Sequence, residues 1–266
     1  TPEIYTLSLH DALPILAAGD VNGDGIADLI AGAVWARPGG RYECGKVFVI
    51  SGARFTATPR LDLSVSLADI EIWGEPGGWA FGNHLGWRVA AGDVNGDGVG
   101  DVVTSTPWAS PTAARGNAGK IYVLFGDRRH PCNLTVDLSV CAANLTVHGR
   151  NAGDNLGYSL ACGNIIKDDA YEDIIVGARG ADPLGRTNAG AVYALLGRPW
   201  KPFKATLVDL NVTAADTTVM GAEPDDFAGT AVAAGRRNPL GKSPLVIGAP
   251  YASPKGRVDA GMAYAF

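Results

Sequence analysis

One pattern recurs four times along the 266-residue chain and constrains its fold more than any other feature. Each copy contains Ala-Ala-Gly-Asp or a close variant. The fourth position of this motif is Asp20, Asp93, Asn164 and Arg236, so successive copies are 73, 71 and 72 residues apart. Two further markers keep this period: a Gly-x-Val-Tyr-Val-like run from Gly45, Gly119, Gly190 and Gly261, and a Val-Asp-Leu-like run around Asp62, Asp137 and Asp209. Three markers that share one period indicate repeated copies of a single structural unit.

Each repeat is predicted to contain four short β-strands. In the second repeat they are residues 85–91, 101–104, 119–123 and 144–148. Each run alternates in polarity or is rich in β-branched residues, and glycine, proline or aspartate bounds it. The 36 glycines and 16 prolines suit many tight turns better than long helices. A four-stranded antiparallel sheet cannot bury both faces alone, so we expect such sheets to stack radially as the blades of an all-β propeller.

The period divides the chain into roughly three and a half blades of a partial β-propeller. We expect blade A at 16–74 with an incomplete first strand, blade B at 75–149, blade C at 150–221, and blade D at 222–266 without its fourth strand. The missing strands do not complement one another, which favours a fragment over a closed four-bladed ring. Residues 1–15 resemble the translation of a sequencing adapter joined to an assembled gene, and we interpret them as an artefact in place of the true N-terminus. A natural N-terminal strand is the alternative.

Two of the repeats carry an acidic nine-residue turn between their first two strands. Oxygen-bearing side chains occupy positions 1, 3, 5 and 9 of both turns, and glycine at position 6 allows the sharp bend that aims the carbonyl of position 7 inward. Calcium takes about six to eight oxygen ligands, and the carboxylates of one turn would repel one another without a cation. We therefore expect two Ca²⁺ sites, formed by Asp20, Asn22, Asp24, Ile26 and Asp28 and by Asp93, Asn95, Asp97, Val99 and Asp101.

The other two repeats depart from this pattern. In the third, one extra residue shifts the register and Lys167 intrudes, so Asp169 and Asp173 are expected to form a weak site or none. In the fourth, the acidic ligands are gone. An EF-hand is disfavoured because it needs a glutamate at position 12, where Ala31 and Thr104 stand in this chain. A plain turn of aspartate, asparagine and glycine without a metal is the alternative.

These features resemble the FG-GAP repeats of integrin α-subunit propellers and their bacterial relatives. The Phe-Gly step of that family has counterparts at either Phe81-Gly82 or Leu85-Gly86, at Leu156-Gly157 and at Phe227-Ala-Gly229, and the Gly-Ala-Pro step is literal only at Gly248-Ala249-Pro250. The resemblance covers residues 16–266. It implies a propeller that is usually extracellular and that holds calcium in the turn between its first and second strands.

The resemblance also places ligands on the face opposite the calcium turns. Aromatic and arginine side chains on loops are favoured binding groups. On the loops of that face they are Trp35, Arg37, Arg41, Trp108, Arg115, Arg186 and Tyr251. We expect this face to bind an extracellular protein or a glycan. Packing of the tryptophans against the rim of the propeller is the alternative.

Charge and composition disfavour some functions. A net charge of −5 gives no reason to expect nucleic acid as a partner, and no apolar run approaches the roughly 20 residues of a membrane span. Cys132 and Cys141 bracket one short segment, and the sequence leaves open whether they pair. His84, His130 and His148 have no partners in an arrangement typical of a nucleophilic enzyme.

We therefore expect a non-catalytic adhesion or recognition module that is extracellular or secreted. Extracellular calcium modules bind the ion with a Kd of about 10⁻⁴–10⁻³ M, so such sites fill outside a cell and stay empty inside it. The alternative is a non-catalytic scaffold propeller attached to a hydrolase or lyase domain that lies outside this sequence.

Overall fold

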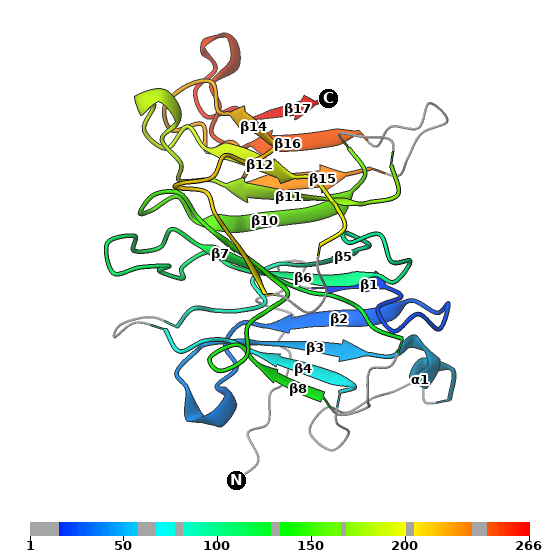
Figure 1. The fold of residues 1–266 in the computed structure, drawn as a ribbon. Helices are drawn as coiled ribbons and strands as arrows, with labels where there is room; N and C mark the ends of the chain where they lie inside the picture. The colour runs from blue at the N-terminus through cyan, green and yellow to red at the C-terminus, as the bar shows by residue number, and fades with distance from the viewer. Residues whose placement is uncertain are drawn as a thin grey trace.

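The computed structural model describes residues 16–57, 68–77, 82–128, 134–165, 169–200, 205–235 and 244–266. Their strands form four sheets that succeed one another along the chain, and the first and last sheets lie at opposite ends of the molecule (Figure 1). The chain is an open array of blades, so the all-β, partial-propeller fold that the repeat predicts is confirmed. The adapter-like residues 1–15 and Cys132 lie outside the described residues.

Each sheet is built mainly from antiparallel neighbours. Blade A contains β1 (Leu16–Gly19), β2 (Asp28–Ala33), β3 (Lys46–Ile50) and β4 (Ile70–Trp73); blade B contains β5 (Val89–Gly92), β6 (Asp101–Thr106), β7 (Lys120–Leu124) and β9 (Leu145–His148). Blade C contains β10 (Leu156–Gly163), β11 (Asp173–Ala178), β12 (Ala191–Leu195) and β14 (Thr217–Met220), and blade D contains β15 (Ala231–Ala234), β16 (Leu245–Ala249) and β17 (Met262–Ala265). A short helix, α1 (Gly52–Ala57), follows β3.

The hydrophobic core lies between the blades. Successive residues of a strand point to opposite faces of its sheet. Val102 therefore belongs to the core between blades A and B, whereas Val103 belongs to the core between blades B and C. Ile174 and Ile175 of β11 face the B–C core and the C–D core in the same way. The second strands of the two inner blades, β6 and β11, consequently carry consecutive apolar residues, because a neighbouring blade covers both of their faces.

The glycine of the first marker stands where neighbouring first strands come closest. A Cβ atom added to it would clash with the Cβ of the residue that precedes the matching glycine in the next blade. These pairs are Gly19 with Ala91 at 2.5 Å, Gly92 with Cys162 at 2.7 Å, and Gly163 with Ala234 at 2.8 Å. The repeat period therefore records a packing requirement between blades.

The third marker forms a strand that the sequence analysis did not predict. The second repeat contributes β8 (Leu134–Asp137), which pairs in parallel with β4 of blade A. The third repeat contributes β13 (Thr206–Asp209), which pairs in parallel with β9 of blade B. The second and third repeats thus each add a fifth strand to the blade before them, and this strand ties neighbouring repeats together. The third-marker run around Asp62 lies outside the described residues.

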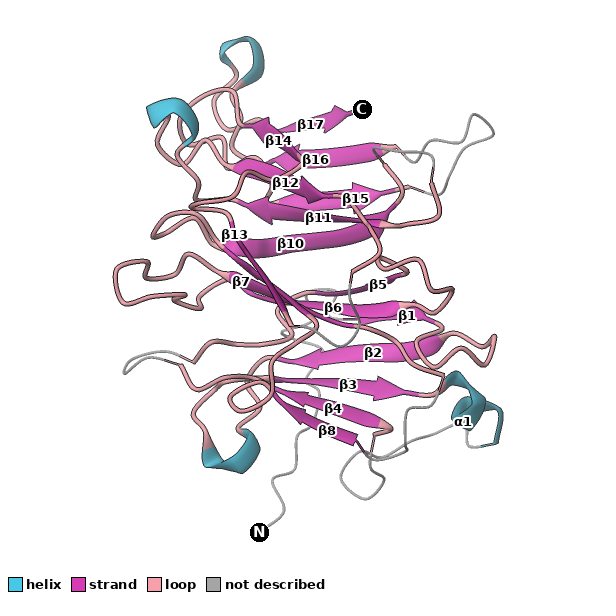
Figure 2. Ribbon diagram, in the orientation of Figure 1, coloured by secondary structure: helices cyan, strands magenta, loops and turns pink. Residues whose placement is uncertain are grey.

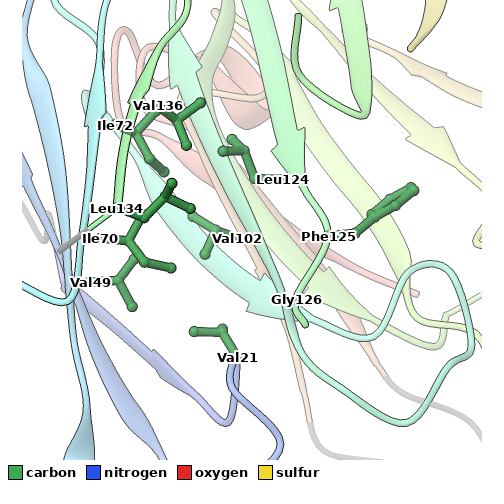
Figure 3. A pocket seen from close by; sticks show the side chains of 10 residues that line it. All are labelled: Val21, Val49, Ile70, Ile72, Val102, Leu124, Phe125, Gly126, Leu134 and Val136. Atoms are coloured by element: carbon green, nitrogen blue, oxygen red, sulfur yellow. The ribbon is translucent and has the colours of Figure 1, made fainter. Parts of the chain in front are cut away.

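Beneath β8, apolar side chains from blades A and B enclose a small space (Figure 3). Leu134 and Val136 of β8 point toward Ile70 and Ile72 of β4, and Val102 of β6 lies across the space. The space measures about 20 Å³, and its apolar lining offers a water molecule little to hydrogen-bond. We interpret it as part of the packed core and not as a ligand site.

Two arginine–aspartate pairs fasten the fifth strands. Arg41 of blade A donates to both carboxylate oxygens of Asp137 at 2.8 and 2.9 Å, and Arg115 of blade B donates to both oxygens of Asp209 at 2.6 and 2.7 Å. Bidentate pairs of this kind are among the stronger and more directional hydrogen bonds in proteins. We call each of them an arginine latch.

The latches give the stability of the chain a defined dependence on acid. The Arg41 guanidinium lowers the pKa of Asp137 to about 2, and Arg115 lowers the pKa of Asp209. An unfolded aspartate titrates near 3.9, so this contribution is complete above about pH 4 and is lost as the pH falls toward 2. We expect the unfolding free energy of the double variant Arg41→Ala/Arg115→Ala to fall less steeply between pH 4 and 2 than that of the unaltered chain. Denaturant titrations at several pH values would measure this, and parallel slopes would contradict it.

Two faces are defined by the connections between strands. The turns that link β1 to β2 and β5 to β6 lie on one face (Figure 1). The one-turn helices Pro38–Gly40, Pro183–Gly185 and Pro254–Gly256 lie on the opposite face (Figure 2). In the part of the chain that the structure describes, no helix has the length and apolar character to cross a membrane.

Candidate functional site

The two predicted calcium turns join the first and second strands of blades A and B. Gly23 and Gly25 of the first turn have φ of 71° and 83°, and Gly96 and Gly98 of the second have φ of 76° and 81°. Only glycine adopts this left-handed region freely. These glycines fold each acidic segment back on itself, so that its side-chain oxygens lie around one tight bend.

Backbone N–H groups hold the acidic side chains of the second turn in place. Asp93 accepts from Gly96 at 2.7 Å, from Asp97 at 3.1 Å and from Gly98 at 2.8 Å. The Asn95 side-chain oxygen accepts from the N–H of Asp97 at 3.0 Å, and Asp97 accepts from the N–H of Val99 at 2.9 Å.

The first turn repeats most of this scheme. Asp20 accepts from the N–H groups of Asp24 at 3.1 Å and Gly25 at 2.8 Å, and Asn22 accepts from Asp24 at 2.9 Å. Asp24 in turn accepts from the N–H of Ile26 at 2.8 Å. Two segments 73 residues apart thus form closely similar acidic bends.

The aspartate at the ninth position is buried in both turns. Asp28 is 1% exposed and Asp101 is 0% exposed. The two oxygens of Asp101 accept from the N–H of Val94 at 2.9 Å and the N–H of Gly126 at 3.0 Å. Asp28 accepts from Val21 and Gly52 in the same way. This aspartate therefore pins the turn to the end of the third strand, a structural role that the sequence analysis missed.

Burial favours the neutral form of these two carboxyl groups. The pKa of Asp101 is raised to about 7, chiefly because the group is buried; the N–H groups of Gly126 and Val94 oppose the shift, and Asp97 and Asp93 add to it. The pKa of Asp28 is raised for the same first reason. A cation beside either group would favour its charged form.

The turn of blade C, described at residues 164–165 and 169–173, keeps the structural part of the pattern. Asp173 accepts from the N–H of Ile165 at 2.9 Å and of Gly197 at 3.1 Å, as Asp28 and Asp101 do in their blades. The Asn164 amide donates to the carbonyl of Asp169 at 2.6 Å. The retention of Asp173 is explained by its two N–H partners without a metal ion. The acidic turn positions of the fourth repeat lie outside the described residues.

The acidic turns fit a hard cation in their chemistry, although their side chains stand apart. Among the described residues, no three carboxylate, imidazole or thiol groups lie close enough together to hold a metal ion. Each ionised carboxylate has more acceptor capacity than the N–H groups present use. Calcium coordination would therefore require the side chains at positions 1, 3 and 5 to converge further.

One side chain beside the two turns was not predicted from the sequence. Arg128 follows β7, and its Cγ atom lies 2.5 Å from the point where a Cβ on Gly23 would stand. Its Nη2 atom lies 3.7 Å from the corresponding point on Gly98. An exposed guanidinium thus lies between the two acidic turns.

Aromatic rings form a chain of contacts across the opposite face, which we call the aromatic belt. Its members are Trp35, His84, Trp87, Trp108, Tyr158, Arg179, Phe227 and Tyr251. The belt brings the three predicted aromatic residues Trp35, Trp108 and Tyr251 onto one face. The two at its ends are accessible, with Trp35 54% and Tyr251 51% exposed.

The inner members of the belt connect the blades. The ring centroids of Trp35 and His84 are 4.6 Å apart, and those of Trp87 and Trp108 are 4.4 Å apart, both edge to face. The Trp87 indole N–H donates to the carbonyl of Tyr158 in blade C at 3.2 Å. Burial lowers the pKa of His84. Packing of tryptophans against the rim of the propeller therefore describes Trp87 well but does not describe Trp35.

The four predicted arginines of this face have different surroundings. Arg37 pairs with Glu43 at 3.2 Å and lies over the Tyr42 ring. Arg41 and Arg115 belong to the arginine latches and so serve the fold. The Nε atom of Arg186 is buried and has no hydrogen-bond partner in the described structure.

The fold and the repeated turns define a class of protein, the FG-GAP β-propellers. Residues 13–50 and 85–124 match the FG-GAP repeat family. Phosphatidylinositol-glycan-specific phospholipase D of Rattus norvegicus is 28% identical over 248 residues, which cover 92% of this chain and 27% of that protein. The Homo sapiens protein of the same name is 30% identical over 215 residues, covering 80% of this chain and 23% of the relative.

Integrin alpha-PS2 of Drosophila melanogaster is also similar, with 28% identity over 191 residues that cover 67% of this chain and 13% of the integrin. The chain contains FG-GAP repeats, and integrin alpha subunits and these phospholipases are among its homologues. It spans about a quarter of the phospholipase relatives and a smaller share of the integrin.

Proposed function

We propose that the chain is a calcium-stabilised FG-GAP propeller module that recognises a protein or a glycan outside the cell. The observation that carries this proposal is the pair of acidic turns, each ending in a buried aspartate. Spacing, glycine positions and charge are all repeated between the two turns, and calcium is the ion that such a set of oxygen ligands suits best.

Calcium would be held by Asp20, Asn22, Asp24 and the carbonyl of Ile26 in blade A, with Asp28 behind them. The second turn would use Asp93, Asn95, Asp97, the carbonyl of Val99, and Asp101. The ion supplies positive charge to carboxylates that otherwise repel one another, and it stiffens one face of the propeller. It takes part in no reaction, and the proposal assigns no catalysis to this chain.

Two arguments support an extracellular location. Calcium modules with a Kd of about 10⁻⁴–10⁻³ M fill only where calcium is abundant. The relatives also include integrin alpha subunits. Neither argument depends on the ends of the chain.

The aromatic belt is the surface that we assign to recognition. Exposed aromatic rings contribute large contact areas at a small entropic cost. Trp35 and Tyr251 expose about half of their surface while their inner edges rest on His84 and Phe227. Their positions are thus fixed before a ligand arrives, which favours binding.

A binding array tests this assignment. The tagged chain, in calcium buffer, is applied to extracellular proteins and glycans, and each hit is repeated with Trp35→Ala and with Tyr251→Ala. We expect binding at least about tenfold weaker in these variants, because exposed aromatic anchors are typical hot spots. Val212→Ala is the matched control, since Val212 is 82% exposed but is not part of the belt. Hits that both variants bind as tightly as the control would remove the belt from the proposal.

The similarity to phospholipases favours a second candidate, a scaffold that positions a catalytic domain. The relative from Rattus norvegicus matches 92% of this chain but is itself much longer. Under this alternative the array yields no hit, and the complete gene encodes a hydrolase or lyase domain beside the propeller.

A further inference from the structure

The outer edge of blade C differs from the outer edges of blades A and B. We propose that β14 and Arg186 form a docking site for an extended strand that pairs in parallel with β14 and presents an aspartate to Arg186. The occupant is a segment of the type x–x–Val–Asp–Leu, the pattern that β8 and β13 share together with the leucine after each strand. This inference is independent of calcium and of the aromatic belt.

Blades A and B show how such a strand is bound. In blade A, the N–H groups of Leu134 and Leu138 donate to the carbonyls of Asp69 and Trp73, both at 3.0 Å. In blade B, the N–H groups of Thr206 and Leu210 donate to the carbonyls of Asn144 and His148 at 2.9 and 3.1 Å. The register and the pair of acceptors are the same in the two blades. The corresponding acceptors in blade C are the carbonyls of Asp216 and Met220.

The edge of β14 has no strand beyond it among the described residues. The central residues of β4 and β9 alternate between buried and half-buried, whereas three of the four residues of β14 are exposed. Met220 is 45% exposed. An unpaired strand edge presents free N–H and C=O groups and readily accepts a further strand.

Arg186 stands where Arg41 and Arg115 stand in their blades. Successive positions are 74 and 71 residues apart, matching the repeat. The N–H of Arg186 donates to the carbonyl of Pro183, as that of Arg41 does to Pro38. Arg41 and Arg115 each bind an aspartate, but Arg186 makes no ion pair in the described structure, and its buried Nε has no partner.

The side chains of the bound strands explain which segments fit. Val136 of β8 turns inward to the space between blades A and B, and Val208 of β13 packs against the core of blades B and C. Asp137 and Asp209, the next residues, meet the latch arginines. A fitting strand therefore needs an apolar residue followed directly by an aspartate, because the first packs against the core between blades and the second neutralises the guanidinium.

The repeat also fixes how a test strand should be attached. β8 begins ten residues after the end of β7, and β13 begins eleven residues after the end of β12; each pairs with the blade before it. An equivalent strand for β14 would follow β17 by the same distance. We therefore extend the full chain after Phe266 with a flexible linker of about ten residues and the sequence of residues 134–139, Leu-Thr-Val-Asp-Leu-Ser. The tether raises the effective concentration of the strand to the order of millimolar.

Hydrogen exchange across residues 217–220 is the readout. We expect exchange at least about tenfold slower in the extended chain than in the unextended chain, because new hydrogen bonds protect the edge of β14. An extension whose aspartate is replaced by lysine should give no protection. Arg186→Ala should abolish the protection, and Arg257→Ala, the matching position in blade D, should retain it.

Arg186→Ala is expected to fold normally, because its guanidinium has no carboxylate to lose; circular dichroism of the unextended variant checks this. Exchange that is unchanged by the extension would overturn the docking site. Equal protection by the aspartate and lysine extensions would overturn the role of Arg186.

Discussion

Removal of calcium with a chelator should lower the thermal midpoint of the folded chain by on the order of 10 °C. Ligand binding stabilises a protein by RT ln(1 + [L]/Kd). For a Kd of about 10⁻⁴–10⁻³ M and calcium at about 10 mM, this amounts to about 1.4 to 2.7 kcal/mol per site. Two sites double this contribution. Differential scanning calorimetry in calcium and in excess EGTA measures it.

The double variant Asp24→Ala/Asp97→Ala is the control for this prediction. These aspartates occupy position 5 of the two turns, and neither is the buried residue that pins a turn to its third strand. The variant should unfold at the same temperature with or without calcium. A calcium response that survives both substitutions would place the ion elsewhere in the molecule.

Gly119→Ala should destabilise the chain by more than about 3 kcal/mol, since a non-glycine residue held at positive φ alone costs about 1–3 kcal/mol. Gly119 has φ of 88°, and its added Cβ would lie 2.2 Å from the carbonyl oxygen of Leu156 in the next blade. That oxygen belongs to the backbone of β10, so relief of the clash would separate blades B and C. Urea unfolding monitored by circular dichroism measures the loss.

Gly116→Ala is a matched control in the same loop. Gly116 is exposed, its φ lies outside the left-handed region, and nothing lies within 4 Å of an added Cβ. Its substitution should change the unfolding free energy by less than about 0.5 kcal/mol. A similar loss of unfolding free energy in the two variants would contradict the claim that Gly119 is needed for the contact between blades.

Much of the fold was predictable because the repeated residues are the ones that pack between blades. Gly92 and its counterparts stand where neighbouring first strands come closest. Val102 and Val103 are both apolar because a neighbouring blade covers each face of their strand. The fourth strand of the second repeat was predicted at residues 144–148, and β9 lies there. These features are local, so each repeat carries its own copy of the signal.

The fifth strands were not predictable in the same way. The run from Leu134 to Asp137 alternates between apolar and polar residues, but this pattern does not indicate which strand it pairs with. In the structure it pairs with β4 of the preceding repeat. The latch that fixes it joins Arg41 to a residue 96 positions later in the chain. Arg41 and Arg115 were therefore predicted to bind a ligand, because the aspartates that pair with them lie far away in the sequence.

The acidic turns show a mixed outcome. Their glycines and spacing predicted a tight bend, and the hydrogen bonds around Asp93 form such a bend. Calcium ligation by the oxygens of the turn stays a prediction. Spacing could not reveal that Asp101 also accepts the N–H of Gly126, which closes the end of β7. The presence of Asp173 in the degenerate third turn follows from this second role.

Titration of calcium into the purified full chain by isothermal titration calorimetry tests the central claim most directly. We expect about two ions bound per chain, and about one after Asp97→Ala, because each acidic turn folds around its own cation. A well-folded chain that takes up no calcium would contradict the proposal. Uptake that is unchanged by Asp24→Ala and by Asp97→Ala would contradict it equally.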